Sequence, residues 1–259
     1  MRIAVLMKEV PDTYSDRGMN LETGLTDRTG DVAADEVGER AAEAALRIAE
    51  RAGKDSTQVD ILTVGPASAA DAVRRGIAMG ANEGILLTDD ALVGADLTLT
   101  AEALAALIRR GEYDLVITGA VSSDGGSGVI APMLGELLDW PALTNLTDLA
   151  VEDGVAEATQ AGDGSVVKLR APLPAVAAVS DEFPDARFPN FKGLMAAKKQ
   201  ELDHVTLDEL GIDATDYARP RTIMVGIERR PARERGEIID AGPGAAAALV
   251  DFLDSRGLV

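Results

Sequence analysis

The chain of 259 residues carries 44 acidic and 25 basic side chains, and its formal net charge is −19. Such a surface repels nucleic-acid phosphates and anionic lipid, so we expect neither as a partner. The sequence has no cysteine and a single histidine, His204. Disulfides, thiolate metal sites, cysteine nucleophiles and zinc sites with several histidines are thereby excluded.

Hydrophobic residues make up 46% of the chain but aromatic residues only 3%, so a core must consist mainly of Ala, Val, Leu and Ile. No stretch approaches the roughly 20 apolar residues of a membrane-spanning helix. The start, "MRIAVLMKEV", is typical of a first strand and not of a secretory signal, so we expect a cytoplasmic protein. The acidic composition favours adaptation to high salt, where the Debye length is roughly 3 Å at 1 M. An ordinary acidic protein is the alternative.

The first half of the chain alternates between two patterns. Apolar, β-branched runs predict strands at 2–10, 59–65, 84–89 and 113–119, and their continuous apolar character is typical of strands covered on both faces. Alanine-rich patterns predict helices at 34–53, 68–81 and 97–111, of which the first and third are expected to end at Gly53 and Gly111. This alternation predicts an α/β fold with a doubly wound, mostly parallel sheet and right-handed crossovers.

The pattern changes after Pro141. Strand-like runs broken by "EDG" and "GDG" predict hairpins, and a loop with three phenylalanines follows from residue 183. A short helical turn is expected at 207–213 and a terminal helix within 242–259. We expect an α/β nucleotide-binding domain at 1–215. Residues 216–259 then form an extended arm and helix, which suggests packing on a partner subunit.

One loop stands out as a candidate binding site. In open parallel sheets, ligands bind outside the carboxyl ends of the strands, where the strand order reverses. The loop "TGAVSSDGGSGVIAP" (118–132) follows the fourth predicted strand and leads into a helical pattern. Its glycines allow close backbone approach, and its amides with the helix start suit a phosphate. The alternative is a flexible connection that binds nothing.

Other phosphate and catalytic signatures are missing. The sequence has no GxxxxGK[ST] motif, and no GxGxxG follows the first predicted strand. His204 lies in an acidic segment with no serine or cysteine constellation around it. Asp12, Asp35 and Asp124 lie in separate loops, so solvated acids are the default interpretation. We therefore predict a binding protein with no catalytic residue and no metal site.

The motifs together resemble a known family from end to end. They include "VLMKEVPDT", "TVGPASAADAVRRGIAMGANEGILL", "DLVITGAVSSDGGSGVIAPMLGELLDWP" and "LPAVAAVSDEFPDARFPNFKGLMAAKKQEL". In order and content they resemble the β subunit of electron transfer flavoprotein. The resemblance implies a fold similar to adenine nucleotide α-hydrolases and an electron carrier subunit that is not itself an enzyme. A stand-alone nucleotide-binding regulator similar to universal stress proteins is the rival interpretation.

The resemblance also implies cofactors and partners. The chain is expected to pair with an α subunit that carries a redox-active FAD, and to pass electrons from acyl-CoA-type or other dehydrogenases to an acceptor. Its own site is expected to hold AMP, or a second FAD in the electron-bifurcating type. Asp35-Glu36 and Val121 depart from the Asn-Pro and glutamine that the family usually has, which removes side-chain hydrogen bonds. The implied cofactor-binding residues are Leu6, Asp35, Glu36, Val37, Gly38, Val64, Gly119, Ala120, Val121, Ser122, Ser123, Asp124, Gly125, Gly126, Ser127, Gly128, Val129 and Ile130.

The segment "ARFPNFKGLMAAKK" resembles the family's docking loop for dehydrogenases. Phe191 stands at the apolar anchor position, with Leu194 and Met195 beside it. An exposed aromatic residue in an acidic protein is a plausible interface hot spot. The alternative is a phenylalanine packed into the local core.

Overall fold

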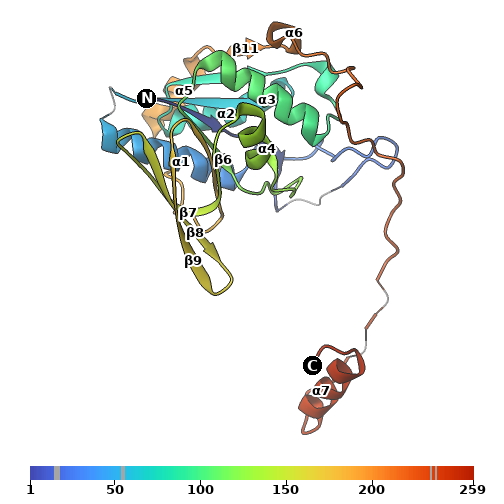
Figure 1. Ribbon diagram of the computed structural model, residues 1–259. Coiled ribbons are helices and arrows are strands. Elements are labelled where there is room, and N and C mark those ends of the chain that lie inside the picture. Colours follow the sequence, from blue (N-terminus) through green and yellow to red (C-terminus); the bar gives the residue numbers. More distant parts are fainter. Residues whose placement is uncertain (15–17, 54–55, 234, 237) are drawn as a thin grey trace. The chain divides into compact units, whose positions relative to one another are not determined.

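The computed structural model describes residues 1–14, 18–53, 56–233, 235–236 and 238–259. It divides into two compact units, Met1–Val225 and Gly226–Val259 (Figure 1). The first unit is built on one large sheet with the strand order β11-β5-β4-β1-β6-β10-β7-β8-β9. All neighbours from β11 to β7 are parallel, and the two pairs at the β9 end are antiparallel. The predicted α/β fold with a doubly wound, mostly parallel sheet is confirmed. The strands of this sheet are β1 (Arg2–Leu6), β4 (Gln58–Val64), β5 (Glu83–Leu87), β6 (Leu115–Gly119), β7 (Ala142–Glu152), β8 (Val155–Gly162), β9 (Ser165–Pro172), β10 (Ala175–Val179) and β11 (Asp203–Val205).

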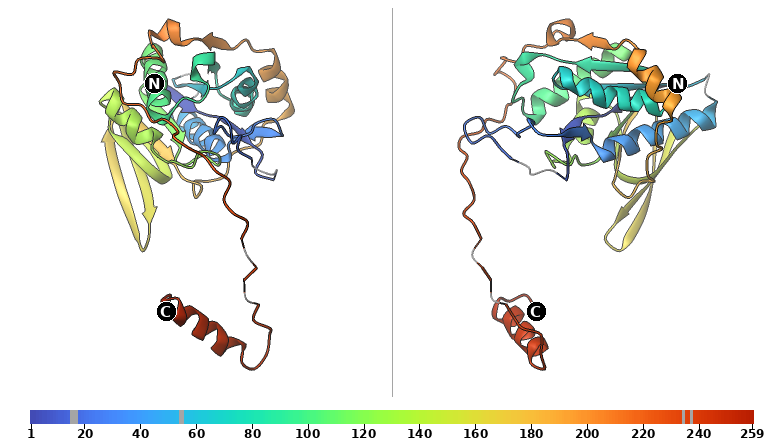
Figure 2. Two further views of the ribbon diagram at one scale, coloured as in Figure 1. Left: turned by 90° about the vertical axis from the view of Figure 1, so that its right-hand side faces the viewer. Right: turned by 180° about the vertical axis from the view of Figure 1, so that it is seen from behind.

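Helices cover both faces of the parallel part (Figure 2). Helices α1 (Glu36–Ala52) and α2 (Ala70–Met79) pack on one face, and α3 (Leu97–Gly111) and α4 (Ile130–Leu138) on the other. Successive side chains of β1 alternate between the two cores: Ile3 and Val5 join the α1 side, and Ala4 and Leu6 the α3 side. Small alanine side chains on α1 bring the helix close to the strands, which is how a core with few aromatics is filled.

The predicted strand at 2–10 is wrong in its second half. Strand β1 ends at Leu6, and a separate strand β2 (Glu9–Pro11) pairs antiparallel with β3 (Val32–Ala34) outside the main sheet. Met7 still donates its amide to the Leu62 carbonyl at 3.1 Å, so the chain leaves the sheet at Lys8. Pro11 has no amide to donate, which suits a two-stranded ribbon better than a central strand.

Both predicted glycine helix ends are confirmed, but the two glycines have different roles. Gly53 follows the last residue of α1 and has a φ of 93°. Gly111 is the last residue of α3, and it is Glu112 that takes the left-handed conformation, with a φ of 52°. A Cβ on Gly111 would overlap the Tyr113 ring. Gly111 therefore serves close packing and not the chain reversal.

The second half forms the predicted hairpins. Asp153 and Gly154, with φ values of 49° and 75°, connect β7 to β8, as two-residue hairpin turns require. Gly164, at 71°, lies between β8 and β9. The docking-loop segment forms α5 (Phe191–Lys199), and the helical turn expected at 207–213 is α6 (Leu207–Leu210). His204 lies on the edge strand β11 and is exposed.

The segment that follows α6 is joined to the first unit by polar contacts. Arg221 and Arg219 form ion pairs with Glu102 of α3, at 2.8 and 3.3 Å. The Thr222 amide donates to the Asp96 carboxylate, which also caps α3. The second unit contains the expected terminal helix, α7 (Ala245–Ser255). Packing of 216–259 on a partner subunit stays a prediction. None of the helices in the described ranges has the length and apolar character needed to cross a bilayer.

Candidate functional site

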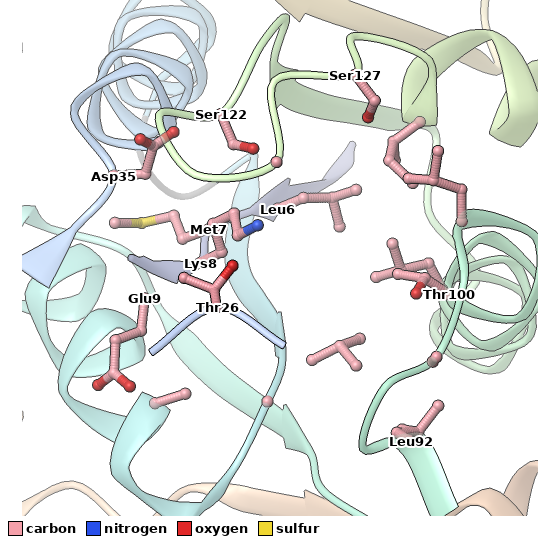
Figure 3. Close-up of a pocket in the computed structure, with 18 of the residues that line it drawn as sticks. Leu6, Met7, Lys8, Glu9, Thr26, Asp35, Leu92, Thr100, Ser122 and Ser127 are labelled. Atoms are coloured by element: carbon pink, nitrogen blue, oxygen red, sulfur yellow. The ribbon is translucent and has the colours of Figure 1, made fainter. Parts of the chain in front are cut away.

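A cavity opens at the carboxyl end of the sheet, where the strand order reverses. From β1 the chain runs outward through β4 and β5, and then returns to the other side of β1 with β6 and β10. Leu6 and Gly119, the last residues of β1 and β6, therefore lie at the switch point, the usual ligand position in such sheets. A cavity of about 800 Å³ lies there, bounded by both residues (Figure 3).

Most of the predicted cofactor-binding residues line this cavity. They are Leu6, Asp35, Gly38, Val64, Gly119, Ala120, Ser122, Gly125, Ser127, Gly128, Val129 and Ile130. The structure does not bring the others to the cavity wall: Glu36, Val37, Val121, Ser123, Asp124 and Gly126. Val37, Ser123 and Asp124 support the wall from behind. Glu36 is exposed on the first turn of α1.

Asp124 holds two cations at the cavity. Its carboxylate accepts from Lys8 Nζ at 2.7 Å and from Arg28 Nη2 at 2.6 Å, and its side chain is only 4% exposed. It also accepts from the Gly125 amide at 2.6 Å. Burial by itself would raise the pKa of Asp124, but hydrogen bonds and charge from Lys8, with hydrogen bonds from Arg28 and Ser122, hold that pKa well below its usual range. Asp124 is therefore ionised, and Lys8 and Arg28 lie on the cavity wall as fixed positive groups.

The start of α1 supports the loop after β6. Asp35 is buried and precedes α1, yet its side chain does not cap that helix. Its carboxylate instead accepts from the Ser123 amide at 3.1 Å. Gly119 is equally constrained, because a Cβ there would lie 3.0 to 3.2 Å from atoms of Val37. The Asp35 and Val37 contacts fix the position of the loop against the helix.

The loop itself presents backbone groups. Gly126 and Gly128 have φ values of 65° and 66°, in the left-handed region that favours glycine. The Val121 side chain is 48% exposed and lies over Gly128. Helix α4 begins beside the cavity at Val129 and Ile130, and no side chain caps its first turn. The free amides at this helix start can therefore donate hydrogen bonds to an anionic group, and the positive end of the helix dipole attracts it.

The rest of the wall lies outside the predicted set of cofactor-binding residues. It includes Lys8, Arg28, the segment from Thr88 to Leu97 and Thr222. Lys8 belongs to the segment that follows β1, which the sequence places at the carboxyl end of the first strand. Arg28 lies in a segment without periodicity, and Thr222 is more than a hundred residues from its neighbour Asp96. No pattern in the sequence connects either of them to the loop.

The acidic residues of the wall have structural roles. Asp89 accepts from the amides of Ala91 and Leu207, at 3.0 and 3.1 Å, and Asp96 caps α3. Within the ranges that the structure describes, no group of three or more His, Cys, Asp or Glu side chains is arranged to hold a metal ion. Asp35, which precedes α1, and Asp124, in the loop after β6, both already accept hydrogen bonds from the chain.

The predicted docking residues lie on α5. Phe191 is 78% exposed, and Leu194 and Met195 are 40% and 42% exposed. A phenylalanine packed into the local core is therefore not what the structure contains. Helix α5 rests closely on α2, because a Cβ on Gly193 would overlap the Ala78 carbonyl oxygen. Phe191, Leu194 and Met195 consequently project from a helix that packs closely on α2.

We predict that Asp124→Asn lowers the free energy of unfolding at pH 7 by about 1–3 kcal/mol, because a neutral amide cannot hold both cations. The pKa of Asp124 is lower in the folded state than its reference value of 3.8. The stability it contributes is thus present above that value and is lost as the pH falls below it. The difference between wild type and variant should stay constant above about pH 5 and shrink below about pH 4.

Urea unfolding followed at several pH values measures this difference. Asp185→Asn is the matched control, since Asp185 also pairs with an arginine but is 90% exposed; its effect should stay below about 1 kcal/mol. Equal losses for the two variants, or a difference that does not change with pH, would contradict the buried ion cluster.

Comparison with known proteins agrees with this architecture. Residues 23–210 match the family described as electron transfer flavoprotein domain. Curated relatives include the electron transfer flavoprotein subunits beta of Mycobacterium leprae, 39% identical over 99% of both chains, and of Bacillus subtilis, 33% identical over the full length of both. The caffeyl-CoA reductase-Etf complex subunit CarD of Acetobacterium woodii is 30% identical, also over the full length of both. These matches favour the electron carrier over a stand-alone regulator, and the chain belongs to the electron transfer flavoprotein family.

Proposed function

We propose that this chain is the β subunit of a heterodimeric electron transfer flavoprotein. It binds an adenine nucleotide in the cavity and helps to hold the FAD of an α subunit, while electrons pass from a dehydrogenase to an acceptor. The observation that carries the proposal is the match to β subunits over the full length of both chains. The flavin supplies the redox chemistry, and the protein supplies its position and electrostatic environment.

The cavity supports the nucleotide part of the proposal. Lys8, Arg28 and the uncapped start of α4 lie on its wall and suit a phosphate group. Leu6, Leu62 and Val64 supply apolar surface at the ends of β1 and β4, which suits a base. The departures at Asp35 and Val121 leave these features in place, since Asp35 binds the loop backbone and Val121 lies off the wall.

AMP is the first candidate for the nucleotide, and a second FAD is the alternative. The cavity favours neither by its polar groups, but it continues past the glycine loop to Thr88–Leu97 and Thr222. That extension gives a specific reason to keep the larger ligand under consideration. A chain that holds a second FAD would belong to the electron-bifurcating type.

Coexpression with the α subunit tests the whole proposal. We expect a heterodimer whose extracted cofactors are AMP and one FAD, identified by mass spectrometry. Two FAD molecules per heterodimer would instead select the bifurcating form. A homodimer that binds ATP and no flavin carrier would overturn the proposal in favour of the stand-alone regulator.

We predict that Gly126→Ala weakens nucleotide binding about tenfold, measured as the dissociation constant for AMP. An alanine at this φ costs about 1–2 kcal/mol, and the loop can relieve that strain by moving its amides. Gly164→Ala is the matched control, because Gly164 has a similar φ of 71° and, like Gly126, has no atom within 4 Å of its Cβ position. It lies in the hairpin turn between β8 and β9. Equal nucleotide affinity of the two variants would argue against the loop as the binding element.

The exposed face of α5 is proposed to dock on acyl-CoA-type or other dehydrogenases. Phe191, Leu194 and Met195 supply an apolar anchor on a seated helix, and interface hot spots are enriched in such aromatic anchors. We further propose a cytoplasmic location for the heterodimer.

We predict that Phe191→Ala slows reduction of the flavin by a partner dehydrogenase roughly tenfold or more, because the anchor side chain is lost. The FAD content should not change. Tyr14→Ala serves as the control, since Tyr14 is 96% exposed and belongs to the segment after β2. Stopped-flow flavin absorbance gives the rates, and unchanged kinetics in Phe191→Ala would count against docking through α5.

A further inference from the structure

Part of the cavity wall comes from an irregular segment outside the main sheet. Leu25, Thr26 and Arg28 all line the cavity, and they lie in the chain between β2 and β3. In the described part of the segment around them, residues 18–31 form a turn at 21–23 and an isolated bridge between Met19 and Thr26, and they are largely exposed. Core packing therefore contributes little to holding it in place. We refer to residues 24–28 as the strap.

Side-chain contacts hold the strap at two opposite rims of the cavity. At one end, Arg28 donates to Asp124 of the glycine loop at 2.6 Å and to the Glu9 carbonyl at 2.9 Å. At the other end, Leu25 lies beside Gly94 in the segment after β5, where a Cβ on Gly94 would be 3.4 Å from Leu25 Cδ2. The Met224 side chain lies against Gly24. The strap thus spans from the loop after β6 to the loop after β5, and Thr26 marks its course in Figure 3.

We propose that the strap closes the cavity over its ligand, and that Arg28 is the positioning residue that holds it shut. The identity of the ligand as an adenine nucleotide rests on the proposed function. A ligand bound beneath residues 24–28 can exchange only when the strap leaves one of its rims. The arginine contact therefore governs how fast the ligand enters and leaves.

The Arg28–Asp124 ion pair holds the strap more strongly than the apolar contacts of Leu25 and Met224 do. Leu25 is 37% exposed and Met224 is 52% exposed, so each buries only part of its side chain. Arg28 by contrast binds a carboxylate that is only 4% exposed, where a charged hydrogen bond is stronger than at the surface.

The Arg28–Asp124 ion pair can also open at low cost in free energy. Asp124 is shared between Arg28 and Lys8, so release of Arg28 leaves the buried carboxylate paired with Lys8. Opening therefore avoids the penalty of an uncompensated buried charge. The Arg28 side chain is 36% exposed, so water can solvate its guanidinium as it leaves.

Pulse-chase exchange of radiolabelled AMP on the full-length protein tests the proposal. For Arg28→Ala we expect the association rate constant to rise about tenfold, because the strap opens more often, and the dissociation rate constant to rise by more than that, because the cavity wall also loses a positive group that suits the phosphate. Arg28→Lys should exchange AMP more slowly than Arg28→Ala, though still faster than wild type. Arg110→Ala is the matched control, because Arg110 forms a similar 2.7 Å ion pair with Asp203 away from the cavity wall, and it should exchange AMP like wild type.

Hydrogen exchange gives a readout that needs no ligand. The amides of Asn20, Gly24 and Asp27 are hydrogen-bonded within the segment and should exchange faster in Arg28→Ala but not in Arg110→Ala. Unchanged amide exchange together with unchanged AMP rates would overturn the strap. A weaker affinity with unchanged association would overturn it as well, since Arg28 would then be a simple ligand contact. If wild type binds no AMP but the amides respond as expected, the strap stands and the nucleotide assignment fails.

Discussion

The candidate site depends on one buried carboxylate. Asp124 connects three parts of the chain that are far apart in sequence: the loop after β6, Lys8 after β1 and Arg28 between β2 and β3. Without an ionised group at this position, two cations would repel each other across the cavity wall. With it, the three segments hold together and the cluster of Asp124, Lys8 and Arg28 retains one net positive charge. The same interaction thus supplies both the shape of this rim of the cavity and a local positive group that suits the proposed anion.

The sheet explains why these segments meet. The reversal of strand order around β1 places the carboxyl ends of β1 and β6 next to each other, and both strands lead into loops at that edge. Val37 at the start of α1 packs against Gly119, and Asp35 binds the Ser123 amide. The loop is therefore held from behind by α1 and from the side by the cations. A glycine-rich loop fixed in this way can present its amides in one geometry, which a freely moving connection cannot.

Sequence patterns predict the parts of this arrangement that are local. Apolar strands, alanine-rich helices and the hairpin turns at Gly154 and Gly164 follow from periodicity and turn chemistry, and the glycine loop follows from its place after a strand. Patterns fail where a contact joins distant segments. Nothing local distinguishes Arg28 from the other arginines of an acidic chain, and Thr222 bonds to Asp96, which is 126 residues away in the chain. Gly111 illustrates the same limit, because the helix end at this residue is predicted but its close contact with the Tyr113 ring is not.

The net charge of −19 raises the question of how such a chain would attract the phosphate of the proposed nucleotide. At physiological ionic strength the Debye length is about 8 Å, so most surface acids are screened from a ligand inside the cavity. Lys8, Arg28 and the start of α4 act at contact distance, where screening is weak and the surroundings are less polar than water. The acids on the opposite wall, Asp89 and Asp96, are already committed to backbone amides, and their charge disfavours a reversed ligand. The charge of the outer surface and the charge proposed to orient the ligand therefore act at different ranges, and the two requirements do not conflict.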